Sequence, residues 1–138
     1  MSALYTPQML ALTTELARHP LGTHHDRTAQ GRSTVCGSAL ELGLDLDANG
    51  NVERIGMRVT ACAVGQSSAA IMAGSITGRD PSQIHSAVAQ IRSWLDGEGR
   101  SPEWPRFEVL TAALAHPGRH GALVLPWETA AKALSAMK

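Results

Sequence analysis

The sequence predicts an α+β fold in which a small, hairpin-based antiparallel sheet packs against several helices. Leucines alternate with polar or small residues from 40 to 46, as in a half-buried strand. An Asn49-Gly50 turn separates this run from a second alternating run, which predicts a hairpin. Apolar residues at helical spacing lie on both sides of the hairpin. With 138 residues, the chain is long enough for one domain with a real core, spanning residues 1–138.

The chain is expected to open with a helix. Thr6 is a typical N-cap residue and Pro7 suits the first helical position. The helix is expected to run to about His19, because Pro20 cannot continue it. Residues 21–33 are polar and glycine-containing, and they are interpreted as a loop.

The hairpin is expected to have strands at 39–47 and 52–61. A hairpin returns the chain to the place where it began. Cys62, at the end of the second strand, should therefore lie near Cys36, although the two are 62 − 36 = 26 positions apart.

Helices should dominate the second half of the chain. Asp80 and Pro81 form an expected cap, and Pro126 is expected to start the last helix. The three tryptophans are expected to pack in the core, although an exposed Trp104 in its proline-rich loop would mark a partner surface. The expected helices cover residues 67–76, 81–95, 107–115 and a stretch starting at 126.

The composition excludes some functions. Twelve basic and twelve acidic residues cancel, and no basic stripe invites nucleic acid. No apolar run is long enough to cross a membrane, and the N-terminus lacks a signal-peptide pattern. A cytoplasmic location is therefore expected, where two cysteines do not usually form a structural disulfide.

Cys62 is the most informative residue for chemistry. It follows a β-like run and precedes small and polar residues typical of a helix start. Free backbone N–H groups and the helix dipole favour a thiolate at that position. A thiolate is what a soft metal or a sulfur-transfer reaction requires.

Several motifs together resemble the IscU/SufU/NifU N-terminal family of iron–sulfur cluster assembly scaffolds. The long segment after Cys62 makes the SufU branch the most similar. The resemblance implies the family's α+β fold and a scaffold rather than an enzyme. The motifs are His19-Pro20-Leu21-Gly22, Cys36-Gly37-Ser38 before the hairpin, Ala61-Cys62-Ala63-Val64 before a small-residue helix, and Leu125-Pro126-Trp127.

The sequence departs from the family at two of four expected ligands. The aspartate after Cys-Gly is Ser38, and counting back from Trp127 places the third cysteine at Ala122. The resemblance leaves Cys36 and Cys62 to bind iron, an iron–sulfur cluster or zinc. Ser38 would be a weak ligand, since a hydroxyl is poor beside thiolates.

A complete shell would need further ligands. His120 is the best placed histidine, being two positions before the expected third cysteine, and His24 and His25 are second choices. Alternatively, two chains could face each other as a homodimer and share a cluster through four cysteines.

By resemblance, the chain would accept sulfur from a cysteine desulfurase and serve recipient apo-proteins. Two alternatives remain open. A degenerate paralogue would keep the fold and act as an interaction or regulatory module without a cluster. A persulfide relay would use Cys62 as a nucleophile that accepts and passes on sulfur.

Overall fold

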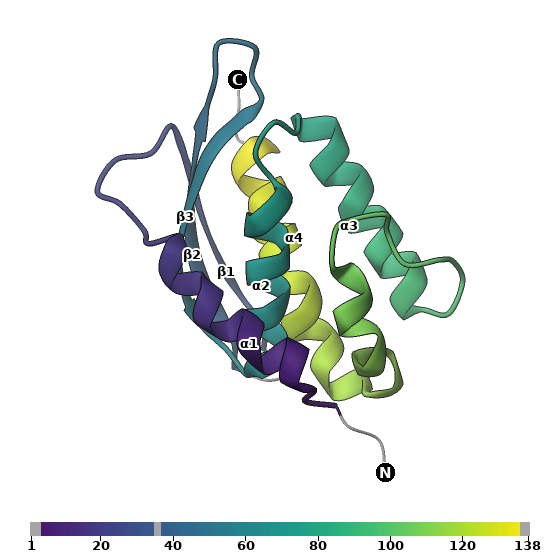
Figure 1. The fold of residues 1–138 in the computed structure, drawn as a ribbon. Coiled ribbons are helices and arrows are strands. Elements are labelled where there is room, and N and C mark those ends of the chain that lie inside the picture. Colours follow the sequence, from purple (N-terminus) through teal and green to yellow (C-terminus); the bar gives the residue numbers. More distant parts are fainter. Residues whose placement is uncertain (1–3, 35–36, 136–138) are drawn as a thin grey trace.

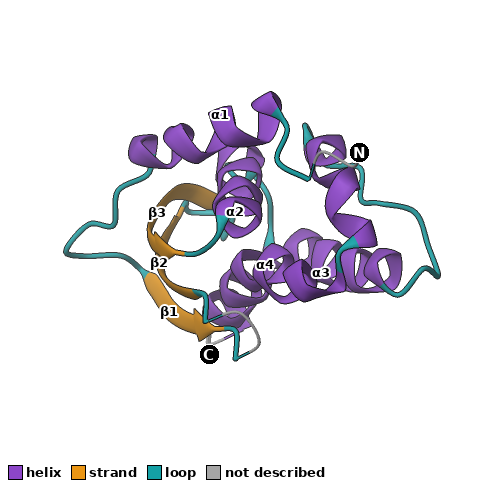
Figure 2. Cartoon of the chain, turned by 90° about the horizontal axis from the view of Figure 1, so that it is seen from below, coloured by secondary structure: helices purple, strands orange, loops and turns teal. Residues whose placement is uncertain are grey.

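The computed structural model describes residues 4–34 and 37–135 (Figure 1). The order of elements confirms the predicted α+β class. Helices α2 and α4 pack on one face of the sheet, and α3 lies beyond them (Figures 1 and 2). The elements are α1 (Pro7–Glu15), the 3₁₀ helix η1 (Leu16–Arg18), β1 (Arg27–Arg32), β2 (Ala39–Leu46), β3 (Val52–Thr60), α2 (Ala63–Ser75), α3 (Pro81–Leu95), the 3₁₀ helices η2 (Phe107–Ala115) and η3 (Pro117–Arg119), and α4 (His120–Ser135).

The three strands form an antiparallel sheet in the order β1-β2-β3. The predicted hairpin is confirmed as β2 and β3. Alternation buries Leu40, Leu42 and Leu44 against the helices, each 3% exposed or less. The opposite face of the sheet carries mostly polar side chains, so one face is packed and one is largely open.

Strand β1 corrects the expected loop at 21–33. Its outer face carries polar side chains, and its inner face carries small ones such as Ala29 and Gly31. This composition produces no apolar alternation, so the sequence pattern does not indicate a strand here. Pairing with β2 makes it a strand, because strand formation depends on neighbours more than on intrinsic preference. Gly31 has no Cβ, and a Cβ there would overlap the hydroxyl of Thr129 on α4.

A crossing segment, residues 19–26, connects α1 to β1 from the opposite edge of the sheet (Figure 2). The N–H of Met57 donates to the carbonyl of His19 at 2.8 Å, which ties its start to β3. Gly43 and Gly56 are paired across β2 and β3. The His25 ring lies where a Cβ of Gly43 would be, and the Pro20 backbone lies where a Cβ of Gly56 would be. The glycine pair therefore makes room for the crossing segment.

Asp45 fastens the end of the crossing segment. Its carboxylate accepts from the Asp26 N–H at 3.1 Å and from Arg54 Nε at 3.0 Å, and it lies 3.4 Å from Nδ1 of His25. The Asp26 carboxylate in turn accepts from the Leu46 N–H at 2.8 Å. Burial alone would raise the pKa of Asp45. The hydrogen bonds from Arg54 and Asp26 and the nearby charges outweigh burial and lower that pKa.

The free energy of unfolding should therefore fall in acid. A carboxylate with a lowered pKa in the folded state contributes fully above its unfolded pKa of about 3.9. That contribution is lost as the pH falls through the lower folded pKa. We expect urea unfolding measured from about pH 6 to about pH 2.5 to show a shallower acid loss in Asp45→Asn than in the parent chain. Equal acid slopes in both proteins would contradict the assigned role of Asp45.

The helix starts are confirmed where caps were expected. Thr6 accepts from the Met9 N–H at 3.1 Å, and Asp80 forms a capping box with Gln83. The last helix is a correction, because α4 begins at His120 and contains Pro126 in its interior. Proline lacks an N–H, so the helix loses one internal bond at this position. The helix continues because α4 is buried against α2, α3 and the sheet.

The tryptophans lie in the core, as expected. Trp127 is fully buried and donates its Nε1–H to the Ser68 hydroxyl at 2.8 Å. Trp104 is 5% exposed, donates to the Ile71 carbonyl at 2.9 Å, and meets Trp127 edge to face. Trp104 therefore does not mark an exposed partner surface. Within the described residues, no helix is long and apolar enough to span a membrane.

Candidate functional site

Three segments that are distant in the sequence meet at one end of the sheet. Ala39 pairs with Thr60, so the residues just outside this pair, Ser38 and Ala61, extend from the same end of the hairpin. The start of α4 reaches the same region, because a Cβ on Gly121 would lie 2.8 Å from Oγ of Ser33. The fold thus brings together the three regions to which the resemblance assigns ligands, around Ser38, Cys62 and Ala122.

Cys62 is the N-cap residue of α2, which confirms its predicted place at a helix start. Its backbone is extended, its carbonyl accepts from the Gln66 N–H at 2.9 Å, and its side chain makes no capping hydrogen bond. The residue is half-buried and not in a disulfide. The first N–H groups of a helix have no partners within the helix, so they can stabilise a negative charge on sulfur.

A Cys62→Ser variant should remain folded. Serine is a preferred N-cap residue, and the cap position of Cys62 lacks a side-chain hydrogen bond. We expect a free energy of unfolding unchanged or raised by up to about 1 kcal/mol, measured by urea titration. A loss of stability would show that the sulfur itself supports the fold. The expected result makes this variant suitable for chemical tests, because any lost function would reflect the missing thiol.

Ala122 lies against the first turn of α2, the helix that Cys62 caps. A Cβ on Gly65 would lie 3.3 Å from the Ala122 Cβ and 2.8 Å from the Ala61 Cβ. Ala122 is 1% exposed, so its methyl group is enclosed between the two helices. Gly65 and Gly121 are close-contact residues that the sequence motifs did not indicate. The available signal was a glycine close after Cys62 and another next to Ala122, since glycine permits close contact between backbones.

Ser38 is also enclosed. It is 2% exposed, and its carbonyl accepts from the Ser33 N–H at 2.8 Å. Cys36 lies outside the described residues, so its predicted nearness to Cys62 stays a prediction.

The histidines have other partners. His120 has Nε2 2.9 Å from the Leu114 carbonyl, so this nitrogen is placed to donate to η2. His25 lies over the sheet, where its Nε2 accepts from the Gly22 N–H at 2.9 Å. His24 is exposed in the crossing segment. Among residues 4–34 and 37–135, no three His, Cys, Asp or Glu side chains form a group that could hold a metal ion.

The site therefore fits some chemistries better than others. Its described part holds one thiol at a helix N-terminus, a buried alanine against the first turn of the same helix, and a buried serine just before β2. A tetrahedral metal centre or an iron of a cluster requires four ligands. The described residues do not supply that set, but they do supply one half-buried free thiol at a helix N-terminus.

Comparisons with solved structures establish the fold. The structure of a NifU-like N-terminal protein from Brucella abortus has a TM-score of 0.88 at 23% identity, covering 97% of this chain and 94% of that chain. A putative iron–sulfur cluster assembly scaffold, SufU from Fervidobacterium islandicum AW-1, has a TM-score of 0.83 at 18% identity, covering 95% and 96%. A hypothetical protein has a TM-score of 0.67 at 18% identity, covering 93% and 97%. No family model and no curated protein sequence matches the chain.

These likenesses confirm the expected IscU/NifU-like fold, with SufU among the matches. They extend over nearly the whole length of both chains. At such identities they concern the arrangement of helices and strands, so the chemistry has to be argued from this chain's own residues.

Proposed function

We propose that the chain is a scaffold-like protein of iron–sulfur cluster assembly that accepts sulfur on Cys62. The observation that carries the proposal is the position of this thiol. It caps α2 at the end of the sheet where the three motif segments meet, in a fold shared with a putative cluster assembly scaffold. Cys36 is the second thiol of the proposed site. The protein is a carrier and assembly platform and not an enzyme that turns over a substrate.

The proposed sulfur step is a thiol–persulfide exchange with a cysteine desulfurase. The Cys62 thiolate attacks the terminal sulfur of a persulfide on the donor. A bond forms between Cys62 Sγ and that sulfur, the donor's S–S bond breaks, and the electron pair leaves with the donor cysteine as a thiolate. One S–S bond replaces another, so no external oxidant or reductant is needed.

Iron or a cluster would be cargo of this protein. Cys36 and Cys62 offer two thiolates per chain, and an iron in a cluster has four ligands. A homodimer that shares one cluster between four cysteines satisfies this count, and delivery to recipient apo-proteins follows when the pair opens. Zinc on the same two cysteines is the alternative cargo. His120 would join as a further ligand only by giving up its contact with the Leu114 carbonyl.

The test is anaerobic reconstitution with ferrous iron, cysteine, a cysteine desulfurase and dithiothreitol, which supplies the electrons that reduce persulfide sulfur to sulfide. We expect iron and acid-labile sulfide to bind together, with one cluster per two chains in solution, and both to be lost in Cys36→Ser and in Cys62→Ser. His120→Ala tests the further ligand. The scaffold proposal would be contradicted if the parent protein bound no more iron and sulfide than the two cysteine variants do.

A persulfide relay is the second candidate. The buried Ala122 and the absence of a three-ligand group among the described residues favour it, because a relay needs one thiol and no metal. Absence of bound iron in that reconstitution, together with added sulfur on Cys62 when the reductant is left out, would support this candidate. If Cys62 accepts neither sulfur nor metal, the remaining function is that of an interaction or regulatory module.

A further inference from the structure

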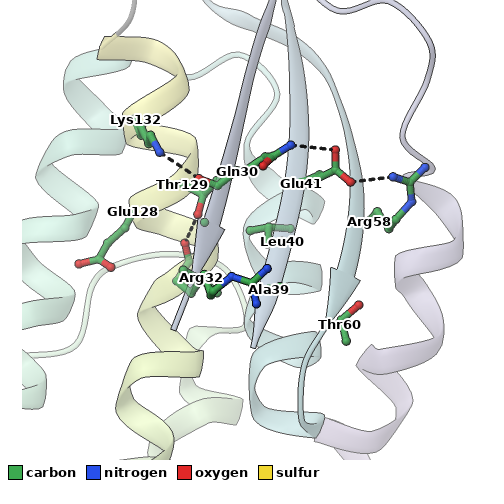
Figure 3. Close-up of a pocket in the computed structure, with 12 residues that line it drawn as sticks. Gln30, Arg32, Ala39, Leu40, Glu41, Arg58, Thr60, Glu128, Thr129 and Lys132 are labelled. Carbon is green, nitrogen blue, oxygen red and sulfur yellow. Dashed lines mark hydrogen bonds and ion pairs between the residues drawn. The ribbon is translucent and has the colours of Figure 1, made fainter. Parts of the chain in front are cut away.

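A groove of about 640 Å³ is lined by residues of β1, β2 and β3 and, past the free edge of β1, by helix α4 (Figure 3). It lies beside the candidate site without including Cys62. Arg32 is the last residue of β1, and Thr60, which also lines the groove, is two positions before Cys62. Its other polar lining residues include Gln30, Glu41, Glu128 and Lys132.

The edge of β1 directs backbone groups away from the sheet. The Ser33 N–H donates to the Ser38 carbonyl, which continues the ladder with β2. Along an antiparallel edge strand, alternate residues face the partner strand and the free edge. Residues 28, 30 and 32 therefore direct their N–H and C=O groups away from β2. The Gln30 carbonyl confirms this direction, because it accepts from Lys132 Nζ at 3.1 Å.

The groove has unneutralised positive charge. Glu41 is paired with Arg58 at 2.7 Å, and Glu128 is paired with Arg92 on α3. Lys132 and Arg32 are both exposed, and in the described part of the chain neither forms an ion pair with a carboxylate. Both acidic side chains of the groove are thus paired, Glu41 with Arg58 of the groove and Glu128 with Arg92 outside it, and two cations of the groove are not.

We propose that this groove docks an extended acidic segment of a partner protein. The segment adds to the free edge of β1 through backbone hydrogen bonds, and its carboxylates bind Arg32 and Lys132. The Lys132 ammonium group has three N–H donors and uses one for Gln30, so it can hold the strand edge and a carboxylate together. A nucleic acid has no peptide backbone to pair with the free edge of β1, which favours a protein segment in this place.

Docking here would place the partner next to the thiol without contact between the partner segment and Cys62. The groove and the thiol are joined by a short connection, because Thr60 lines the groove and lies two positions before Cys62. The inference goes beyond the proposed sulfur chemistry, because it concerns charge and a strand edge only. A Cys62→Ser variant should therefore dock the segment as well as the parent chain does.

The test is fluorescence anisotropy with a labelled peptide of about eight residues in which glutamate and valine alternate. We expect saturable binding at low ionic strength. Arg32→Ala and Lys132→Gln should each weaken it at least about fivefold. Lys132→Gln keeps a donor for Gln30 and so protects the strand edge. Arg100→Ala is the matched control, because it removes an exposed positive charge outside the groove and should change the affinity less than about twofold.

A second peptide, alternating glutamate and proline, has the same charge but lacks half of the backbone donors. We expect it to bind at least about tenfold more weakly, because edge pairing is lost. The proposal is overturned if the valine peptide does not bind, if Arg32→Ala and Lys132→Gln leave its affinity unchanged, or if both peptides bind equally. Tighter binding of a single-stranded oligonucleotide at the same residues would also overturn it. Circular dichroism of each variant confirms that the fold is intact.

Discussion

An Ala122→Cys variant is expected to bind Zn²⁺ roughly 100-fold more tightly than the parent chain. The Ala122 methyl group lies against the first turn of α2, which Cys62 caps, so a sulfur there would add a third thiolate to the proposed site. Structural zinc sites with four ligands bind with about 10–16 kcal/mol, or about 3 kcal/mol per ligand. At 1.4 kcal/mol per factor of ten, one added ligand is worth roughly 100-fold.

Competition with a chromophoric zinc chelator measures this change. Ala73→Cys is the matched control, because Ala73 is also buried, at 4% exposed. It lies in α2, 11 positions after Cys62 and therefore about 16 Å further along the helix. A buried thiol at that distance should leave the zinc affinity unchanged. An equal gain in the control, or no gain in a folded Ala122→Cys protein, would show that residue 122 does not face the site. Ser38→Asp, added to Ala122→Cys, should raise the affinity further.

Replacing Gly56 by valine is expected to lower the free energy of unfolding by about 3 kcal/mol. A Cβ at this position would overlap the Pro20 carbonyl oxygen and lie 3.1 Å from the Leu21 Cα. Both are backbone atoms of the crossing segment, so no flexible side chain can move aside. The segment would have to leave the sheet, and the hydrogen bond from Met57 to His19 would be lost with it.

Urea unfolding with matched circular dichroism tests this expectation. Gly118→Ala is the control, because a Cβ there meets no atom within 4 Å, and its stability should stay within about 0.5 kcal/mol of the parent. Valine normally favours strands. A stability equal to or above that of the parent in Gly56→Val would therefore contradict the close crossing of the sheet.

The hairpin and the helix caps could be predicted from the sequence because their signals are local. Alternating leucines, an Asn-Gly turn and cap residues each specify structure within a few positions. Strand β1 and the crossing segment could not, because their causes are tertiary. The role of Gly43 and Gly56 depends on their pairing across two strands and on the crossing segment that packs against them. The helical continuation through Pro126 likewise depends on packing around α4.

Local signals likewise made one part of the candidate site predictable, and tertiary contacts made the rest unpredictable. The position of Cys62 at a helix start follows from residues on either side of it, and the structure confirms it. The partner of His120 is the backbone carbonyl of Leu114, and no sequence pattern predicts this contact. The charge balance of the groove depends on the pairing of Glu128 with Arg92, which are 36 positions apart.

Intact-protein mass spectrometry after incubation with a cysteine desulfurase and cysteine tests the central claim most directly. The account predicts that the parent chain gains the mass of one sulfur atom, that a reductant removes it, and that peptide mapping places it on Cys62. Cys62→Ser should remain unmodified while keeping its fold. Absence of added sulfur on the folded parent chain, or addition undiminished in Cys62→Ser, would contradict the assignment of Cys62 as the sulfur acceptor.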